Sequence, residues 1–214
     1  MARKILTWTI VVAVMVALGL VINRVRFWAF CAVGLALVLY GSFSIDPTLA
    51  AERRRPAGPT IDSKALRAIR VSALVAMVAA ICDISFGHWS DTVPAAVSAV
   101  ALAVCTAAMW LVIRSMMANA FFSSAIRIQK DRGHALVSTG PYATVRHPGY
   151  LGMATSLPTA VLALGSWIAL VPALLYSTLI IRRAGQEDAF LQANLNGYAD
   201  YARQVRYRIA PGIW

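Results

Sequence analysis

The fold class of this chain is decided by residues 149–183, GYLGMATSLPTAVLALGSWIALVPALLYSTLIIRR. As one α-helix, the apolar run from Tyr150 to Ile181 would be about 48 Å long, whereas the hydrocarbon core of a bilayer is about 30 Å thick. Gly165 and Ser166 lie near the middle of this run, where the chain can turn back. The run therefore predicts a tight hairpin of two membrane helices, roughly 149–164 and 167–183.

Four further apolar segments precede this hairpin. They cover residues 5–22, 27–45, 66–86 and 93–113. The 214-residue chain is 59% hydrophobic and 14% charged, whereas soluble domains are about 45–50% apolar and about 25% charged. We therefore predict an all-α, polytopic transmembrane bundle of about six spans, the last two of which form the hairpin.

The net charge of +11 is explained by membrane topology better than by a nucleic-acid partner. Positively charged loops remain preferentially on the cytoplasmic side. If the termini and the segments 46–70 and 114–147 lie there, every Lys and Arg except Arg24 and Arg26 is cytoplasmic. We therefore predict a multi-pass protein of the cell inner membrane, with both termini cytoplasmic, the lipid bilayer as a partner and no nucleic acid.

Several common sites are not indicated. Cys31, Cys82 and Cys105 lie inside apolar segments without a CxxC or Cys/His cluster, so neither a disulfide framework nor a metal site is predicted. The basic run Arg53–Arg55 reads as an ordinary solvated loop that touches anionic headgroups.

A polar and aromatic cluster, GPYATVRHPGYLG at residues 140–152, directly precedes and opens the hairpin. Ionisable groups at a bilayer boundary are costly and are usually retained because they bind or react. Pro148 suits the first turn of a helix, whose amides near His147 attract anions such as a ligand carboxylate. Gly152 leaves room for a bulky group. An interfacial belt of snorkelling side chains is the alternative.

A second cluster, RRAGQEDAFL at residues 182–191, follows the hairpin. Arg183 and Glu187 are four residues apart and share a face if this segment is helical. An exposed ion pair would explain the same spacing, and only the first cluster favours a functional reading. The tail, residues 195–214, alternates aromatic and basic residues, which suits a helix on the membrane surface or a cover over a cytoplasmic site.

Taken together, these clusters resemble the isoprenylcysteine carboxyl methyltransferase family and its phospholipid methyltransferase relatives. The resemblance covers residues 127–214, which would be the catalytic region, while 1–126 would be a transmembrane scaffold. The motifs that carry it are His134-x-Leu136-Val137-x-x-Gly140-x-Tyr142, Arg146-His147-Pro148-x-Tyr150-x-Gly152, Arg183-x-x-x-Glu187-Asp188-x-x-Leu191 and the terminal Tyr201…Pro211 pattern.

The resemblance implies that S-adenosylmethionine binds between the hairpin and the cytoplasmic segments and leaves as S-adenosylhomocysteine. Arg183 and Glu187 would be catalytic, with Arg183 also binding the acceptor; the role of Asp188, where the family usually has a second glutamate, is open. The implied cofactor-binding residues are Gln129, His134, Ala135, Leu136, Val137, Tyr142, His147, Pro148, Gly149, Tyr150 and Glu187.

The predicted function is that of an integral membrane methyltransferase. Its acceptor would be lipophilic, with a prenylated carboxylate of isoprenylcysteine type preferred. A thiol S-methyltransferase, a phospholipid N-methyltransferase and a non-catalytic membrane binding or transport protein are the alternatives.

Overall fold

A computed structural model describes residues 24–56, 58 and 62–212, together with isolated positions 9, 12, 13, 16, 17, 19, 20 and 22. The predicted first span, 5–22, therefore lies largely outside the described residues, as do the last two residues of the tail. Within the described part of the chain all regular structure is helical and no strand occurs, which confirms the all-α prediction.

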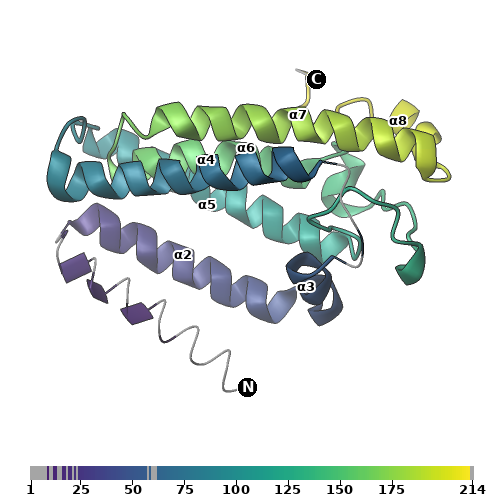
Figure 1. Cartoon of the computed structure of the whole chain (residues 1–214), viewed down its shortest axis with the longest axis horizontal. Helices are drawn as coiled ribbons and strands as arrows, with labels where there is room; N and C mark the ends of the chain where they lie inside the picture. Colours follow the sequence, from purple (N-terminus) through teal and green to yellow (C-terminus); the bar gives the residue numbers. More distant parts are fainter. Residues whose placement is uncertain are drawn as a thin grey trace.

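The long helices form a bundle, and two short helices lie at the same end of it (Figure 1). The long helices are α2 (Val25–Ser44), α4 (Ser63–Cys82), α5 (Ala95–Ala118), α6 (Pro148–Leu164) and α7 (Leu170–Asn194). The shorter elements are α3 (Pro47–Arg54), the π-helical turn η1 (Asp83–Gly87), the 3₁₀ turns η2 (Lys130–Arg132) and η3 (Gly140–Ala143), and α8 (Tyr198–Gln204).

Three of these helical segments are long and apolar enough to cross a membrane: Val25–Ser44, Ser63–Gly87 and Ala95–Ala118. They coincide with the predicted spans 27–45, 66–86 and 93–113. The protein is therefore an integral membrane protein by the length and composition of its helices. The total of six spans stays a prediction.

The last two long helices form the predicted hairpin. α6 ends at Leu164 and is capped by Gly165, whose φ of +106° lies in the left-handed region that glycine adopts without a steric penalty. α7 begins at Leu170 and continues to Asn194, well beyond the predicted end at residue 183. The second polar cluster, 182–191, is therefore part of α7, because its Ala, Gln, Glu and Leu residues are good helix formers.

Gly152 allows close packing of α6 against α5. A Cβ atom at this position would lie 2.5 Å from the carbonyl oxygen of Ala108 and 2.6 Å from a methyl carbon of Val112. The expectation that Gly152 leaves room for a bulky group is therefore wrong, since the neighbouring helix α5 already fills the space. Gly152 thus allows α5 to lie close to α6, the helix that begins directly after His147 and contains Tyr150.

The two ends of the bundle gather different loops. At one end Arg24 pairs with Asp91 (2.7 Å), Arg26 donates to the carbonyl of Val93 (2.8 Å), and the hydroxyl of Ser166 donates to Asp83 (2.6 Å). At the other end lie α3, the segment 119–147 and α8 (Figure 1). The loops predicted to be cytoplasmic thus share one end, and the arginines predicted to be external share the other.

Candidate functional site

A cavity of about 290 Å³ lies at the end of the bundle that carries α3 and α8. Its walls come from the irregular segment 119–137, the start of α6, the second half of α7 and the tail. All but one of the predicted site residues line it, namely Gln129, His134, Ala135, Leu136, Val137, Tyr142, His147, Gly149, Tyr150, Arg183 and Glu187. The exception is Pro148, which is fully buried as the first residue of α6.

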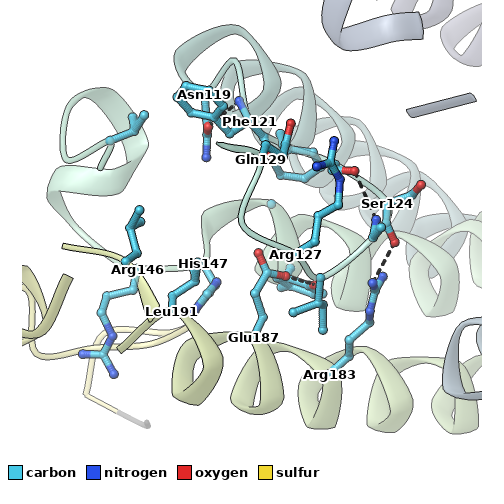
Figure 2. A pocket seen from close by; sticks show the side chains of 18 of the residues that line it. Asn119, Phe121, Ser124, Arg127, Gln129, Arg146, His147, Arg183, Glu187 and Leu191 are labelled. Carbon is cyan, nitrogen blue, oxygen red and sulfur yellow. Dashed lines mark hydrogen bonds between the residues drawn. The ribbon is translucent and has the colours of Figure 1, made fainter. Parts of the chain in front are cut away.

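Glu187 extends from α7 into the space below the 119–129 segment, with His147 and Arg183 on either side of it (Figure 2). The hydroxyl of Tyr150, one turn into α6, donates to its carboxylate over 2.5 Å. This bond fixes the orientation of the carboxylate across the two arms of the hairpin. Glu187 is only partly buried, so the carboxylate can meet a cationic or hydroxyl group of a ligand.

Arg183 is held by a partner far away in the sequence. Its guanidinium donates to both carboxylate oxygens of Asp62, at 2.6 and 3.4 Å, and to the carbonyl of Ser124 at 2.7 Å (Figure 2). Only 6% of the residue is exposed. The alternative reading of an exposed Arg183–Glu187 ion pair is therefore wrong, and Arg183 attaches the 119–129 segment to α7. Its contact with an acceptor stays a prediction.

Gln129 organises the segment above the cavity. Its side-chain amide donates to the carbonyl of Phe121 (2.7 Å) and accepts from Arg132 (2.6 Å), while its backbone N–H donates to Nδ1 of His134 (3.2 Å). The His134 ring packs on the Phe121 ring with centroids 4.6 Å apart. Burial, followed by the charges of Arg127 and Arg132, lowers the pKa of His134, so this imidazole is neutral at pH 7.

Asp188, whose role the sequence left open, is the centre of a buried polar network. Its carboxylate, with 0% exposure, accepts from Arg146 at 2.8 Å and from Arg208 at 3.0 Å. Nε2 of His147 lies 3.2 Å away, and the hydroxyl of Tyr198 donates over 2.9 Å. Burial alone would raise the pKa of Asp188, but hydrogen bonds from His147 and Arg146 hold it well below its usual range.

The tail folds over the cavity. The backbone N–H groups of Arg146 and His147 donate to the carbonyls of Tyr207 (3.0 Å) and Arg208 (2.7 Å), and the hydroxyl of Tyr201 donates to the carbonyl of Tyr142 (2.7 Å). Burial raises the pKa of Tyr201 to about 12, so this donor keeps its proton. Of the two possibilities that the sequence left open, a helix on the membrane surface or a cover over the site, the tail therefore takes the second.

This cover changes one expected contact. Amides near His147 were expected to attract a ligand carboxylate, but the N–H of His147 itself donates to the carbonyl of Arg208 and that of Tyr150 to the carbonyl of His147. His147 instead contributes its ring, which packs edge-on against Tyr150 with centroids 5.7 Å apart.

A second, larger cavity of about 610 Å³ adjoins the first. Its lining is mostly apolar and comes from α2, α4, α5 and α6, with Arg53 and Arg54 of α3 at one end. Arg53 and Tyr176 line both cavities. The sequence reading of Arg53–Arg55 as a solvated loop is therefore wrong for Arg53, because the Asp46-Pro47 start and Leu49 fold this segment into α3 against the site.

Sequence reasoning also missed Arg53, Phe121, Phe122 and Tyr176 as site residues. Phe122 packs so closely on α6 that a Cβ at Gly149 would lie 2.3 Å from its ring. The one available signal was the pair of aromatic residues at 121–122 immediately after an apolar helix, which is also typical of an interfacial belt.

Comparison with known proteins agrees with this geometry. Residues 98–193 match the isoprenylcysteine carboxyl methyltransferase (ICMT) family. No curated protein matches the chain. The matched part begins in α5 and ends in α7, so it contains the whole irregular segment, the hairpin and the Glu187–Asp188 pair. Over residues 98–193, the chain is therefore similar to the isoprenylcysteine carboxyl methyltransferase family of membrane methyltransferases.

Proposed function

We propose that this protein transfers the methyl group of S-adenosylmethionine to the carboxylate of a lipophilic acceptor of the isoprenylcysteine type. The observation that carries the proposal is the convergence of Tyr142, His147, Tyr150 and Glu187 on one cavity. These residues are spread over 46 positions of the sequence and come from η3, the start of α6 and α7.

The residues around the polar cavity suit S-adenosylmethionine chemically. Its volume of about 290 Å³ is close to the lower end of ligand pockets, roughly 300–1,000 Å³. Glu187, oriented by Tyr150, would take the ammonium or a ribose hydroxyl. The aromatic faces of Tyr142 and Phe121 would take the purine or the sulfonium. When bound, the cofactor supplies an electrophilic methyl group.

The chain's own residues contribute orientation more than proton transfer. A carboxylate acceptor is already anionic, so its methylation needs no general base, and good alignment can supply about 7–11 kcal/mol of the barrier. The Tyr150–Glu187 bond and the Asp62–Arg183 pair fix the walls of the cavity. The tail excludes water, which would otherwise weaken these electrostatic contacts.

The adjoining apolar cavity supports a lipophilic acceptor. Its 610 Å³ are lined mainly by side chains of α2, α4, α5 and α6, so a hydrocarbon tail could lie there while its head reaches the polar cavity. A thiol with a similar tail would fit the same space. A phospholipid amine would additionally need a base to remove its proton, for which Glu187 and His147 are the candidates.

Turnover by the purified protein tests the proposal. The protein in detergent is incubated with labelled S-adenosylmethionine and with farnesylated cysteine, phosphatidylethanolamine or a simple lipophilic thiol, and the product is identified by mass. We expect a methyl ester of the farnesylated cysteine. Cofactor binding without any product would support the non-catalytic alternative, and a methylated thiol or amine alone would replace the acceptor.

A further inference from the structure

Arg53 differs from the other arginines around the polar cavity. Five arginines line it: Arg53, Arg70, Arg127, Arg146 and Arg183. Arg127 pairs with Glu52 and Asp131, Arg146 with Asp188, and Arg183 with Asp62, while Arg70 is exposed. No acid among the residues that the structure describes pairs with Arg53. Among the described residues of this site, Arg53 is thus a half-buried cation that pairs with no carboxylate.

The guanidinium of Arg53 has aromatic and carbonyl contacts instead. It lies 5.0 Å above the centroid of the Phe122 ring and donates to the carbonyl of Phe122 at 3.2 Å. It lines the polar cavity together with Tyr142, Tyr150 and Arg183. Burial is the main influence that lowers its pKa, although a guanidinium remains charged at any physiological pH.

The position of this side chain is fixed by the anchoring of α3. The carboxylate of Asp46 caps the helix by accepting from the N–H groups of Thr48 (2.7 Å) and Leu49 (3.3 Å). Leu49 is completely buried. Glu52 pairs with Arg127, and the hydroxyl of Ser124 donates to the carbonyl of Arg53 (3.3 Å). Arg53 is therefore presented to the cavities by a helix held at several points.

The location of Arg53 selects one kind of ligand. Arg53 lines both the polar cavity and the apolar cavity. An acceptor with its apolar tail in one cavity and its polar head in the other would therefore have the junction of head and tail beside Arg53. A partly desolvated cation without an anion is unfavourable, and an incoming carboxylate would relieve that cost. Guanidinium and carboxylate also match in shape, because two parallel N–H···O bonds can form.

We infer that Arg53 binds the negatively charged head of the methyl acceptor, and that acceptors with an anionic head on an apolar tail are preferred for this reason. This inference rests on the proposed function. It assigns Arg183 a different part, since Asp62 already compensates its charge: Arg183 positions the 119–129 segment, and Arg53 contacts the acceptor.

Two ligands that differ only at the carboxyl group test the inference. N-acetyl-S-farnesylcysteine carries a carboxylate, and its methyl ester has the same tail without the charge. Binding of each to purified protein in the same detergent, with S-adenosylhomocysteine present to prevent turnover, is compared for wild type, Arg53→Gln, Arg53→Lys and Arg55→Gln. Arg55 is an exposed neighbour that lines neither cavity, so Arg55→Gln is the matched control.

We expect Arg53→Gln to weaken binding of the acid roughly tenfold or more, as for loss of a hydrogen bond to a charged group, and to leave binding of the ester unchanged. Arg53→Lys should retain part of the preference for the acid, and Arg55→Gln should match wild type. Equal weakening of acid and ester, unchanged binding of the acid, or a wild type without preference for the acid would overturn the inference.

The two proposals can fail separately. If wild type binds the acid through Arg53 but neither binds nor uses S-adenosylmethionine, the proposed function fails and the anion site stands. If the acid is methylated while Arg53→Gln keeps the wild-type KM, the function stands and the assignment of Arg53 fails.

Discussion

At the scale of single residues, the site depends on hydrogen-bonded and charged residue pairs that the local sequence does not predict. Glu187 and Asp188 are adjacent, yet one faces the cavity and bonds to Tyr150 while the other is buried among Arg146, His147 and Arg208. Successive residues on a helix point about 100° apart, so one of two neighbouring acids can face a ligand cavity while the other is buried in the protein. The first is available to a cofactor, and the second holds the tail.

Replacing Asp188 by Asn tests this division. The carboxylate compensates the charges of Arg146 and Arg208, and removing one partner of a buried ion pair usually costs about 3–5 kcal/mol. We expect Asp188→Asn to lower the thermal midpoint of the purified protein clearly, and Asp200→Asn, at an exposed site of α8, to leave it nearly unchanged. Equal midpoints for the two variants would contradict the assignment.

The same carboxylate predicts a pH dependence. Because the folded-state pKa of Asp188 is lowered from 3.8, its contribution to stability is complete above about pH 4 and decreases as the pH falls toward the folded-state value. Thermal midpoints measured between pH 7 and about pH 3 should therefore fall more steeply for wild type than for Asp188→Asn. Parallel curves for the two proteins would rule out this role of the carboxylate.

At the scale of elements, close packing of α5 on α6 positions α6, whose Gly149 and Tyr150 line the polar cavity. Val112 and the backbone of Ala108 occupy the space that a side chain at Gly152 would need. About one turn before Gly152, α6 begins at Pro148, directly after Arg146 and His147, whose backbone N–H groups hold the tail. A change in the α5–α6 spacing should therefore reach both the stability of the bundle and the cavity.

Gly152→Ala tests this packing. The added Cβ would lie 2.5 Å from a backbone oxygen, so one helix must shift, and such overpacking typically costs about 1–3 kcal/mol. Gly34→Ala, in α2, is the matched control because a Cβ there meets nothing within 4 Å and alanine favours a helix. We expect a lower thermal midpoint for Gly152→Ala and an unchanged or higher one for Gly34→Ala. The reverse order would contradict the close approach.

At the scale of the whole molecule, much of the architecture could be predicted because membrane helices are encoded in continuous apolar runs. The ranges 27–45, 66–86 and 93–113 each produced a helix of nearly those bounds, and Gly165 turned the hairpin as expected. The cavity could be predicted only through motif resemblance. Contacts such as Asp62–Arg183, 121 residues apart, leave no local pattern in a single sequence.

The same limit explains why the position of the tail stayed open and why Arg53 was misread. The tail could not be distinguished from a surface helix, because aromatic and basic residues serve both purposes, and its docking depends on Asp188 in another helix. Arg53 could not be distinguished from its solvated neighbours, because only the packing of α3 on the 121–127 segment turns it inward.

We propose above that the polar cavity binds S-adenosylmethionine between the hairpin and the folded tail. The most direct test of this proposal is equilibrium binding of labelled S-adenosylmethionine to purified wild type, Glu187→Gln, Tyr150→Phe and the control Asp200→Asn. We expect a Kd raised about tenfold or more for Glu187→Gln and wild-type affinity for the control. Tyr150→Phe should raise the Kd less, because it leaves the carboxylate and removes only the bond that orients it. Wild-type affinity in both Glu187→Gln and Tyr150→Phe would contradict the proposal.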